Sequence, residues 1–396
     1  MTDFPDDFLF GSATAAHQVE GGNVNSDWWD WEHAPGTVCA ESSGDGIDHY
    51  HRYAEDFALL ASLGHQVHRL SVEWARIEPA RGEFSQAALD HYRRVLRALA
   101  DTGMAAMVTL NHFTLPRWLA AEGGWLAHDA VALFGRYCAR VVAELGDLMP
   151  WICTINEPSV VAMHGYQTGQ FPPGERHQGK WRKAVQRLIG GHEAAVDAVR
   201  DAGLDSPVGI TLAMSPVEVV RDEPAAHVRA AEILAGGIDV YLDGLAGDYV
   251  GVQYYFPVRV DPGRSSGTAD PYPGERRTLM GWPVDPSGLS WCIERAATRS
   301  GLPVFVTENG IATDDDAWRI AYMRDHVLEA KRALDDGIDV RGFLYWSAFD
   351  NFEWTYGYGP TFGMIGIDRE DGLRRIVRDS ARWWERLCRT RTIPPA

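Results

Sequence analysis

The chain has 396 residues, 45% hydrophobic and 23% charged, which is the balance of a globular enzyme, and its formal net charge of −18 argues against nucleic acid and anionic membranes as partners. No apolar run reaches the ~18 residues of a membrane span, and the acidic start MTDFPDDFLFG lacks a signal segment, so we expect a cytoplasmic protein. The five cysteines are widely spread without a CxxC pair, which predicts neither a disulfide framework nor a metal site.

Short apolar runs rich in β-branched and aromatic residues alternate along the chain with longer amphipathic stretches. The stretches 85–103, 128–146 and 317–337 carry apolar residues every three to four positions, which predicts helices with one buried face. In chain order, the predicted strands are 8–15, 66–74, 105–113, 151–157, 208–215, 249–256, 304–310 and 340–349.

Strand–helix alternation repeated eight times predicts the α/β class and a (β/α)₈ TIM barrel, with residues 1–396 forming one catalytic domain. An open doubly wound sheet is the alternative, but no GxGxxG follows the first strand. Residues 258–288 are turn-rich, and we expect them to form a long loop after the sixth strand. A second long connection is expected at 164–181, and it includes Trp181.

Two carboxyl side chains stand where predicted strands end, which is where barrel enzymes place their chemistry. The fourth strand ends in Asn156 and Glu157, and the seventh in Glu308. These strands lie nearly across the barrel, so the two acids can face each other over a substrate. Hydrolysis of a glycosidic bond needs such a pair, one to attack the anomeric carbon and one to protonate the leaving oxygen. Pro158 biases Glu157 away from helical angles and so holds its carboxyl at the strand end.

The other strand ends carry the side chains that a neutral polyol requires. Amides and carboxylates hydrogen-bond hydroxyl groups, and indole rings cover the apolar face of a sugar. In chain order these candidates are Gln18, Glu20, Arg69, Glu73, Asn111, His112, Tyr255, Asn309, Trp346, Glu353 and Trp354.

The segments TINEP (154–158) and VTENG (306–310) resemble the paired motifs of glycoside hydrolase family 1, the retaining β-glucosidases and β-galactosidases. The resemblance covers nearly the whole chain. It implies an exo-acting retaining β-glycosidase that uses no cofactor and takes a small-molecule or oligosaccharide β-glycoside. It rests further on FLFGSATAAHQVEGG (8–22), HRLSVEWARIEPARGEF (68–84), TLNHFTLPRWL (109–119) and YWSAFDNFEWTYGYGPTFGMIGID (345–368).

The resemblance also implies a role for each matching residue. Glu308 resembles the nucleophile that forms a covalent glycosyl-enzyme, and Glu157 the general acid/base. Arg69 and Tyr255 resemble the pair that keeps the nucleophile ionised, and Asn156 the residue that binds the 2-hydroxyl. The remaining implied substrate-binding residues are Gln18, His112 and Glu353 for other hydroxyls, Trp346 under the ring, Trp354 for a further hydroxyl, and Phe362 and Gln253 in the same site.

The chain departs from the family pattern at two points that concern function. Gln253 stands in GVQYY where the family usually has Asn, so the amide is kept with an added methylene. The chain is also shorter than typical members, which predicts trimmed loops at the barrel opening and an open or shallow aglycone region.

Several functional alternatives stay open at this point. The expected substrate is a β-D-glucoside, with β-D-galactosides and β-D-fucosides as alternatives, because the sequence does not decide selection at C4. A transglycosylase would use the same covalent intermediate. The third alternative is a non-catalytic sugar-binding barrel. The presence of both carboxyls and of Arg69 argues against it.

Overall fold

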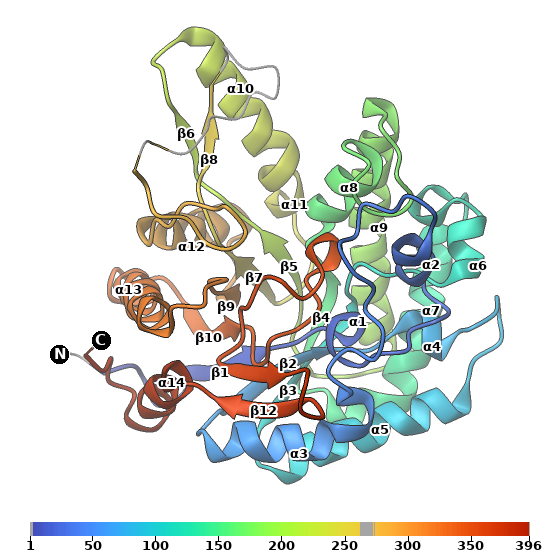
Figure 1. Cartoon of the computed structure of the whole chain (residues 1–396). Helices are drawn as coiled ribbons and strands as arrows, with labels where there is room; N and C mark the ends of the chain where they lie inside the picture. Colours follow the sequence, from blue (N-terminus) through green and yellow to red (C-terminus); the bar gives the residue numbers. More distant parts are fainter. Residues whose placement is uncertain (1–2, 262–271, 273, 396) are drawn as a thin grey trace.

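The predicted strands all form, and they pair in parallel into one closed barrel (Figure 1). The structure is a computed structural model that describes residues 3–261, 272 and 274–395. Closure of the sheet confirms the (β/α)₈ barrel and excludes the open doubly wound alternative. Around the barrel the strands are β1 (Leu9–Ala13), β2 (Val67–Ser71), β3 (Ala105–Asn111), β4 (Trp151–Asn156), β5 (Val208–Ala213), β7 (Tyr249–Gln253), β9 (Val304–Asn309) and β10 (Val340–Trp346), which pairs again with β1.

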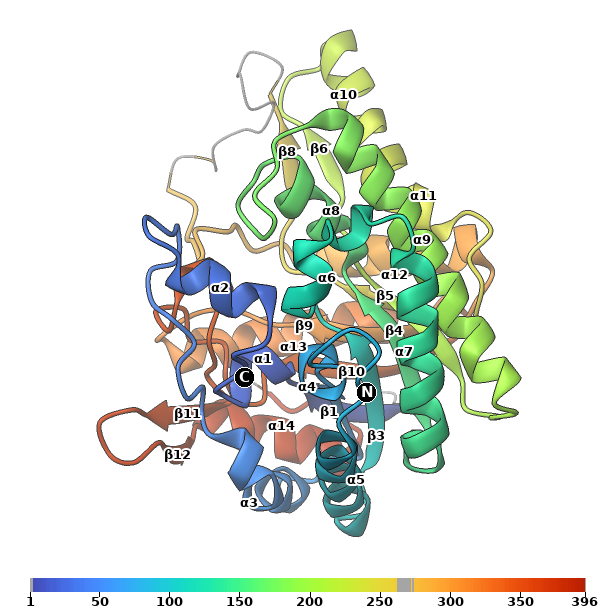
Figure 2. The same ribbon diagram turned by 90° about the vertical axis from the view of Figure 1, so that its right-hand side faces the viewer.

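Helices cover the outside of the barrel, and Figure 2 shows α5, α7 and α9 side by side along one flank. The three helices expected from apolar periodicity form within a few residues of the predicted bounds. No helix in the described part of the chain is long and apolar enough to cross a membrane. The longer helices are α3 (His49–Ser62), α5 (Gln86–Asp101), α7 (Ala130–Leu145), α9 (Gln178–Asp201), α10 (Pro224–Leu234), α12 (Ser287–Ser300), α13 (Asp316–Asp335) and α14 (Asp379–Thr390).

Shorter elements connect these parts. Most of the short helices follow strand ends, so they surround the same end of the barrel as the candidate site residues. They are α1 (Ala16–Val19), α2 (Asp27–His33), α4 (Trp74–Ile77), α6 (Arg117–Ala121), α8 (Pro158–Tyr166) and α11 (Val240–Leu242), with the hairpin β11 (Ile365–Asp368) and β12 (Arg374–Val377) before α14.

Apolar side chains from six strands fill one end of the barrel interior. They form a buried cluster of Val67, Met107, Cys153, Tyr249, Phe305 and Leu344. Because side chains alternate between the two faces of a strand, Arg69 lies on the same face of β2 as Val67, one step further along. The apolar layer therefore closes the barrel beneath Arg69, and polar groups gather at the carboxyl ends of the strands.

Two strands carry one residue more than one neighbouring strand just before the candidate carboxyls. Between Cys153 and Asn156, β4 advances three residues while β5 advances two. Between Val306 and Glu308, β9 advances two residues while β7 advances one. Such a bulge changes which face of the sheet the following side chains occupy.

Both long connections contain more regular structure than expected. Within 258–288, β8 (Val258–Val260) pairs with β6 (Val217–Val219), and with α10 these strands project beyond the barrel (Figure 1). Three-residue strands are too short to show an alternating pattern. The expected loop also spans 262–271 and 273, which lie outside the described residues.

The connection predicted at 164–181 is shorter than expected. Helix α8 continues to Tyr166, and α9 already begins at Gln178, so Trp181 lies on a helix. The reason is a cap: the His177 ring accepts hydrogen bonds from the backbone N–H groups of Gly179 and Lys180, at 3.1 and 3.3 Å. Histidine is an uncommon cap, and for that reason the start of α9 was not apparent from the sequence.

Candidate active site

The Glu308 carboxylate, at the end of β9, is buried and accepts hydrogen bonds from three side chains. Its Oε1 atom accepts from Arg69 and, at 2.8 Å, from the Gln253 amide. Its Oε2 atom accepts from the Tyr255 hydroxyl at 2.7 Å. Donors on both oxygens hold the carboxylate in one orientation and favour its ionised form.

Arg69 is fully buried, and every side-chain nitrogen has a partner. Besides its ion pair with Glu308, it donates to Thr109 Oγ1 at 3.0 Å and to Asn156 Oδ1 at 2.6 Å. Thr211 Oγ1 lies 3.3 Å from the same guanidinium. A buried guanidinium with this many bonds is a fixed positive charge beneath Glu308.

Glu157 differs from Glu308 in backbone and in partners. It has φ 42° and ψ 61°, a left-handed conformation, and it caps α8, whose first residue is Pro158. Pro158 was expected to bias Glu157 away from helical angles; the residue is outside the right-handed region, but its left-handed angles also differ from the extended conformation that proline favours in the preceding residue. Among the residues that the structure describes, none donates a hydrogen bond to the buried Glu157 carboxyl. A buried carboxyl without donors favours its protonated form.

The electrostatic surroundings separate the two carboxyls further. Burial and the charge of Glu308 raise the pKa of Glu157 well above its usual range. Burial also raises the pKa of Glu308, but Arg69 and the Tyr255 hydroxyl act in the opposite direction, so the rise is smaller. Glu308 therefore loses its proton first, and its charge then keeps Glu157 protonated.

Asn156 connects the nucleophile side of the site to His112. Its Oδ1 atom accepts from Arg69, from Gln253 at 2.9 Å and from Thr211 at 3.1 Å, which leaves the NH₂ group facing His112 Nε2 at 3.1 Å. Burial and the Arg69 charge lower the pKa of His112 well below its usual range, so its ring is neutral. With Nε2 accepting, we assign the ring proton to Nδ1, which is buried and has no hydrogen-bond partner among the described residues.

A second polar group, formed by Gln18 and Glu353, lies where β1 and β10 end. The Gln18 amide donates to the Phe352 carbonyl at 2.8 Å and to Glu353 Oε2 at 3.4 Å. Its own Oε1 is buried and has no hydrogen-bond partner in the part of the chain that the structure describes. Burial and the charge of Glu308 raise the pKa of Glu353 to about 8, despite the hydrogen bond from Gln18. Glu353 is therefore largely protonated at neutral pH and can donate as well as accept a hydrogen bond.

Aromatic rings enclose these polar groups. His112 lies nearly parallel to Trp346, at 6.0 Å and 15°, and to Trp354, at 6.1 Å and 10°. Phe362 meets Tyr255 edge-on at 6.0 Å. Trp346 and Phe362 share a cluster with the partly buried Tyr255, Met280 and Trp282.

The structure thus brings together all twelve residues predicted for the site, since hydrogen bonds, ring contacts or charge interactions link each to another. Other polar strand-end residues serve neighbouring segments instead. The Asn309 amide donates to the Tyr254 carbonyl and to Tyr322 on α13, at 2.7 and 3.1 Å. The Glu20 carboxylate accepts hydrogen bonds from Arg76 and from the Tyr92 hydroxyl. The Glu73 carboxylate accepts from the Thr114 hydroxyl, and the Asn111 amide donates to the Thr114 carbonyl.

Four residues of the site were not found from the sequence. Thr109 and Thr211 point inward on β3 and β5, and strand alternation around Arg69 was a usable signal for them. Met280 and Trp282 come from the turn-rich segment after β7, whose path no periodic pattern reveals.

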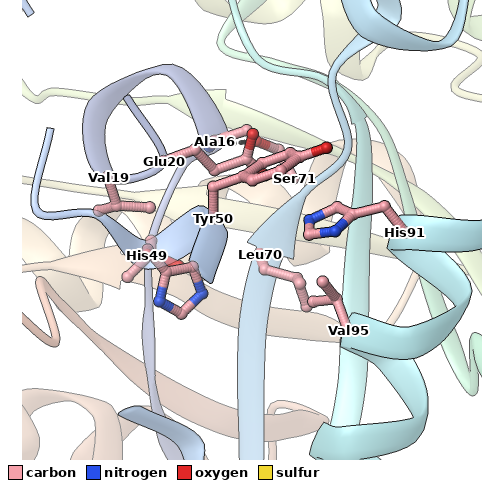
Figure 3. Close-up of a pocket in the computed structure, with 10 residues that line it drawn as sticks. Ala16, Val19, Glu20, His49, Tyr50, Leu70, Ser71, His91 and Val95 are labelled. Atoms are coloured by element: carbon pink, nitrogen blue, oxygen red, sulfur yellow. Dashed lines mark hydrogen bonds between the residues drawn. The ribbon is translucent and has the colours of Figure 1, made fainter. Parts of the chain in front are cut away.

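A small cavity behind α1 is separate from this site (Figure 3). It lies among Glu20, Tyr50, Ser71 and His91, and its volume is about 10 Å³. This is close to the minimum for one water molecule, so the cavity is too small for a sugar.

Comparisons with known proteins agree with the geometry. The profile of glycosyl hydrolase family 1 matches residues 1–255 and 248–393. β-Glucosidase A of Acetivibrio thermocellus is 32% identical over 446 aligned positions, covering 98% of this chain and 98% of that protein. The crystal structure of β-glycosidase BGL167 matches with a TM-score of 0.91 at 42% identity, covering 99% of both chains. The β-glucosidase of Thermotoga maritima in complex with glucoimidazole matches with a TM-score of 0.93 at 28% identity, covering 98% of this chain and 99% of that one. The resemblance seen in the sequence motifs is therefore confirmed: the chain belongs to glycosyl hydrolase family 1 and is a glycoside hydrolase.

Proposed function

We propose that the enzyme removes non-reducing terminal β-D-glucosyl units by double displacement, with Glu308 as nucleophile and Glu157 as general acid/base. The observation that carries these roles is the asymmetry between the two carboxyls. Glu308 accepts three hydrogen bonds, one of them from an arginine, whereas Glu157 is buried without a donor in the described chain. The similar proteins named β-glucosidases support the substrate class.

The reaction follows from these protonation states. In the first step, Glu308 bonds to the anomeric carbon while the bond to the leaving oxygen breaks, and that oxygen takes the proton of Glu157. In the second step, Glu157 removes a proton from water, the water oxygen bonds to the anomeric carbon, and the ester to Glu308 breaks. Retention requires the two carboxyls to lie roughly 5–5.5 Å apart.

Neighbouring groups are proposed to hold the sugar during both steps. The Asn156 amide faces the position of the 2-hydroxyl, a contact that strengthens in the transition state. His112 Nδ1 and Gln18 Oε1, both buried and without a partner within the described residues, supply a donor and an acceptor for further hydroxyls. Trp346 supports the ring, and Glu353, Trp354, Phe362 and Gln253 complete the site.

A panel of nitrophenyl glycosides tests the function. We expect hydrolysis of the β-D-glucoside and no hydrolysis of the α-D-glucoside, because Glu308 attacks from one face only. The rates with the β-D-galactoside and the β-D-fucoside measure how strongly the enzyme selects the configuration at C4. A 6-phospho-β-D-glucoside should be a poor substrate above about pH 8, where Glu353 is ionised and repels phosphate. Turnover of the α-glucoside in preference to the β-glucoside would overturn the proposal.

The pH dependence of kcat/KM tests the roles of the two carboxyls. Activity needs Glu308 ionised and Glu157 protonated, so the acidic limb reports Glu308 and the alkaline limb Glu157. Both pKa values are raised, which places the active range above the usual carboxyl pKa of about 4.3. Tyr255→Phe removes a hydrogen bond to ionised Glu308, so its acidic limb should move up by about one pH unit. An acidic limb that stays in place would show that Tyr255 does not stabilise the charged nucleophile.

Domain organisation and location are also part of the proposal. We infer that residues 1–396 form one catalytic domain, since the strands of the barrel extend from Leu9 to Trp346. A cytoplasmic location is supported by the five cysteines, all of which are free thiols.

A further inference from the structure

The extra residue in β4 gives the strand two consecutive side chains that point out of the barrel, Thr154 and Ile155. Cys153, before them, belongs to the apolar cluster inside the barrel, and Asn156, after them, lies in the site. Strict alternation would place only one outward residue between two inward ones. The outward pair therefore marks the point where the order of side chains shifts, just before Glu157.

Helix α9 packs on the outside of β4 and contacts both of these side chains (Figure 2). Thr154 Oγ1 lies 2.8 Å from His192 Nδ1, and both side chains are buried. Ile155 reaches the residue before this histidine, Gly191, where a Cβ atom would lie 3.3 Å from Ile155 Cδ1 and 2.9 Å from the Trp125 ring. Because Gly191 has no side chain, the backbone of α9 can approach the bulge closely.

The second ring nitrogen of His192 fixes the direction of the hydrogen bond with Thr154. Nε2 lies 2.8 Å from the Ala246 carbonyl oxygen, which can only accept, so Nε2 carries a proton. Burial lowers the pKa of His192 to about 4, although the bond to Ala246 acts in the opposite direction, so the ring is neutral at neutral pH. Nδ1 therefore has no proton and accepts from the Thr154 hydroxyl.

The histidine also connects strands that do not pair with each other. Ala246 lies in the segment that leads into β7, whereas Thr154 lies on β4, and β5 stands between these two strands. Inside the barrel the same two strands meet again, because the Gln253 amide donates to Asn156 at 2.9 Å. His192 thus holds from the outside the strands whose ends form part of the site.

The position of the Glu157 carboxyl depends on its backbone, because no described residue donates a hydrogen bond to this carboxyl. The Glu157 N–H donates to the Thr211 carbonyl at 2.8 Å, which ties the end of the bulge to β5. On the other side of the bulge, the bond between Thr154 and His192 ties its start to α9.

We propose that His192 is a positioning residue for the reaction: by accepting from Thr154 it holds the bulge of β4 and thereby directs the Glu157 carboxyl toward the leaving oxygen. The proposal rests on the proposed function, in which Glu157 protonates that oxygen. His192 does not touch the substrate or the reacting atoms, so its effect should depend on how much a reaction needs the Glu157 proton.

The first test removes this hydrogen bond with little change in volume. Thr154→Val replaces the hydroxyl by a methyl group. We expect kcat/KM for an alkyl β-glucoside to fall about tenfold or more, because a misplacement of ~1 Å at the reacting groups costs on the order of 10²-fold. The loss for a dinitrophenyl β-glucoside should be smaller, because its leaving group departs without a proton.

Two replacements of His192 separate its two hydrogen bonds. His192→Asn keeps an acceptor at the position of Nδ1 and loses the donor to Ala246, whereas His192→Gln keeps a donor near the position of Nε2 and loses the acceptor for Thr154. The asparagine variant should therefore be the more active of the two on the alkyl β-glucoside. The glutamine variant should resemble Thr154→Val.

The control is Ser12→Ala, because Ser12 also has a buried hydroxyl on a barrel strand and lies 3.1 Å from a histidine nitrogen, His65 Nδ1. Thermal unfolding shows which variants are folded at the assay temperature. We expect Ser12→Ala to lower the unfolding temperature and to leave the ratio of kcat/KM on the two glucosides as in the wild type.

The outcomes distinguish positioning from a merely structural role. Wild-type kinetics in Thr154→Val would overturn the proposal, and so would an equal loss on both glucosides. If Thr154→Val does not fold, a glutamine variant of His192 that matches or exceeds the asparagine variant on the alkyl β-glucoside would overturn it as well. Failure of the wild type on both glucosides would instead refute the proposed function itself.

Discussion

Replacing Glu308 by glycine should lower kcat for nitrophenyl β-glucoside by a factor on the order of 10⁵ or more, as for loss of other enzymatic nucleophiles. The carboxylate that bonds to the anomeric carbon is then missing, and neither of the other two site carboxyls, Glu157 and Glu353, has three donors among the described residues. Azide should restore turnover by occupying the vacated position. Because azide then attacks from the nucleophile's own face, the product should be the α-glucosyl azide, measured by NMR.

This experiment needs a folding control, because removing Glu308 leaves the buried Arg69 without its ion-pair partner. Loss of one member of a buried pair costs about 3–5 kcal/mol of stability. Glu308→Gln keeps the side-chain volume, and both variants should be compared with wild type by thermal unfolding. A folded variant that azide converts to the β-glucosyl azide would exclude Glu308 as the nucleophile.

Replacing Glu157 by alanine should reduce activity in proportion to how much the leaving group needs a proton. For an alkyl β-glucoside we expect a loss of about 10²–10⁴-fold, the usual contribution of general acid catalysis. With a dinitrophenyl β-glucoside, the dinitrophenolate leaving group departs without being protonated, so formation of the glycosyl-enzyme should be little affected. Azide should here give the β-glucosyl azide, since it attacks the covalent intermediate from the side opposite Glu308.

The pH profile provides a second readout for the same variant. If Glu157 is the proton donor, the alkaline limb of kcat/KM should disappear in Glu157→Ala and remain in Tyr255→Phe. An equal loss of rate for alkyl and dinitrophenyl glucosides, with the alkaline limb intact, would assign the proton transfer to another group.

Much of the barrel was predictable because its signals are local. Apolar runs gave the strands, periodic stretches gave α5, α7 and α13, and the NEP and ENG segments located both carboxyls. The side-chain directions at the strand ends were not predictable. Strict alternation from the inward-facing Phe305 would turn Thr307 and Asn309 inward and Glu308 outward. The extra residue in β9 reverses this order, and Asn309 instead bonds to Tyr322 on α13.

Contacts between segments that are distant in the chain could not be predicted from the sequence for a related reason. Thr211 meets Asn156 only because β5 pairs with β4 in a register that the bulge in β4 changes. Trp282 reaches the site from an irregular segment, where no repeat relates chain position to direction. Hydrophobic periodicity reports which face of a regular element is buried, and it carries no information where the element becomes irregular.

The extra residues in β4 and β9 also bear on how this enzyme could be re-engineered. The direction in which each reactive carboxyl points is determined by the pairing of the barrel strands, and the loops that follow these strands do not set it. A connection such as 167–177 could therefore be exchanged for that of another protein to accept new alcohols, while bond cleavage continues. Deleting a single residue within 154–155 or at 307 should have the opposite effect, leaving the outer surface unaltered and the enzyme inert.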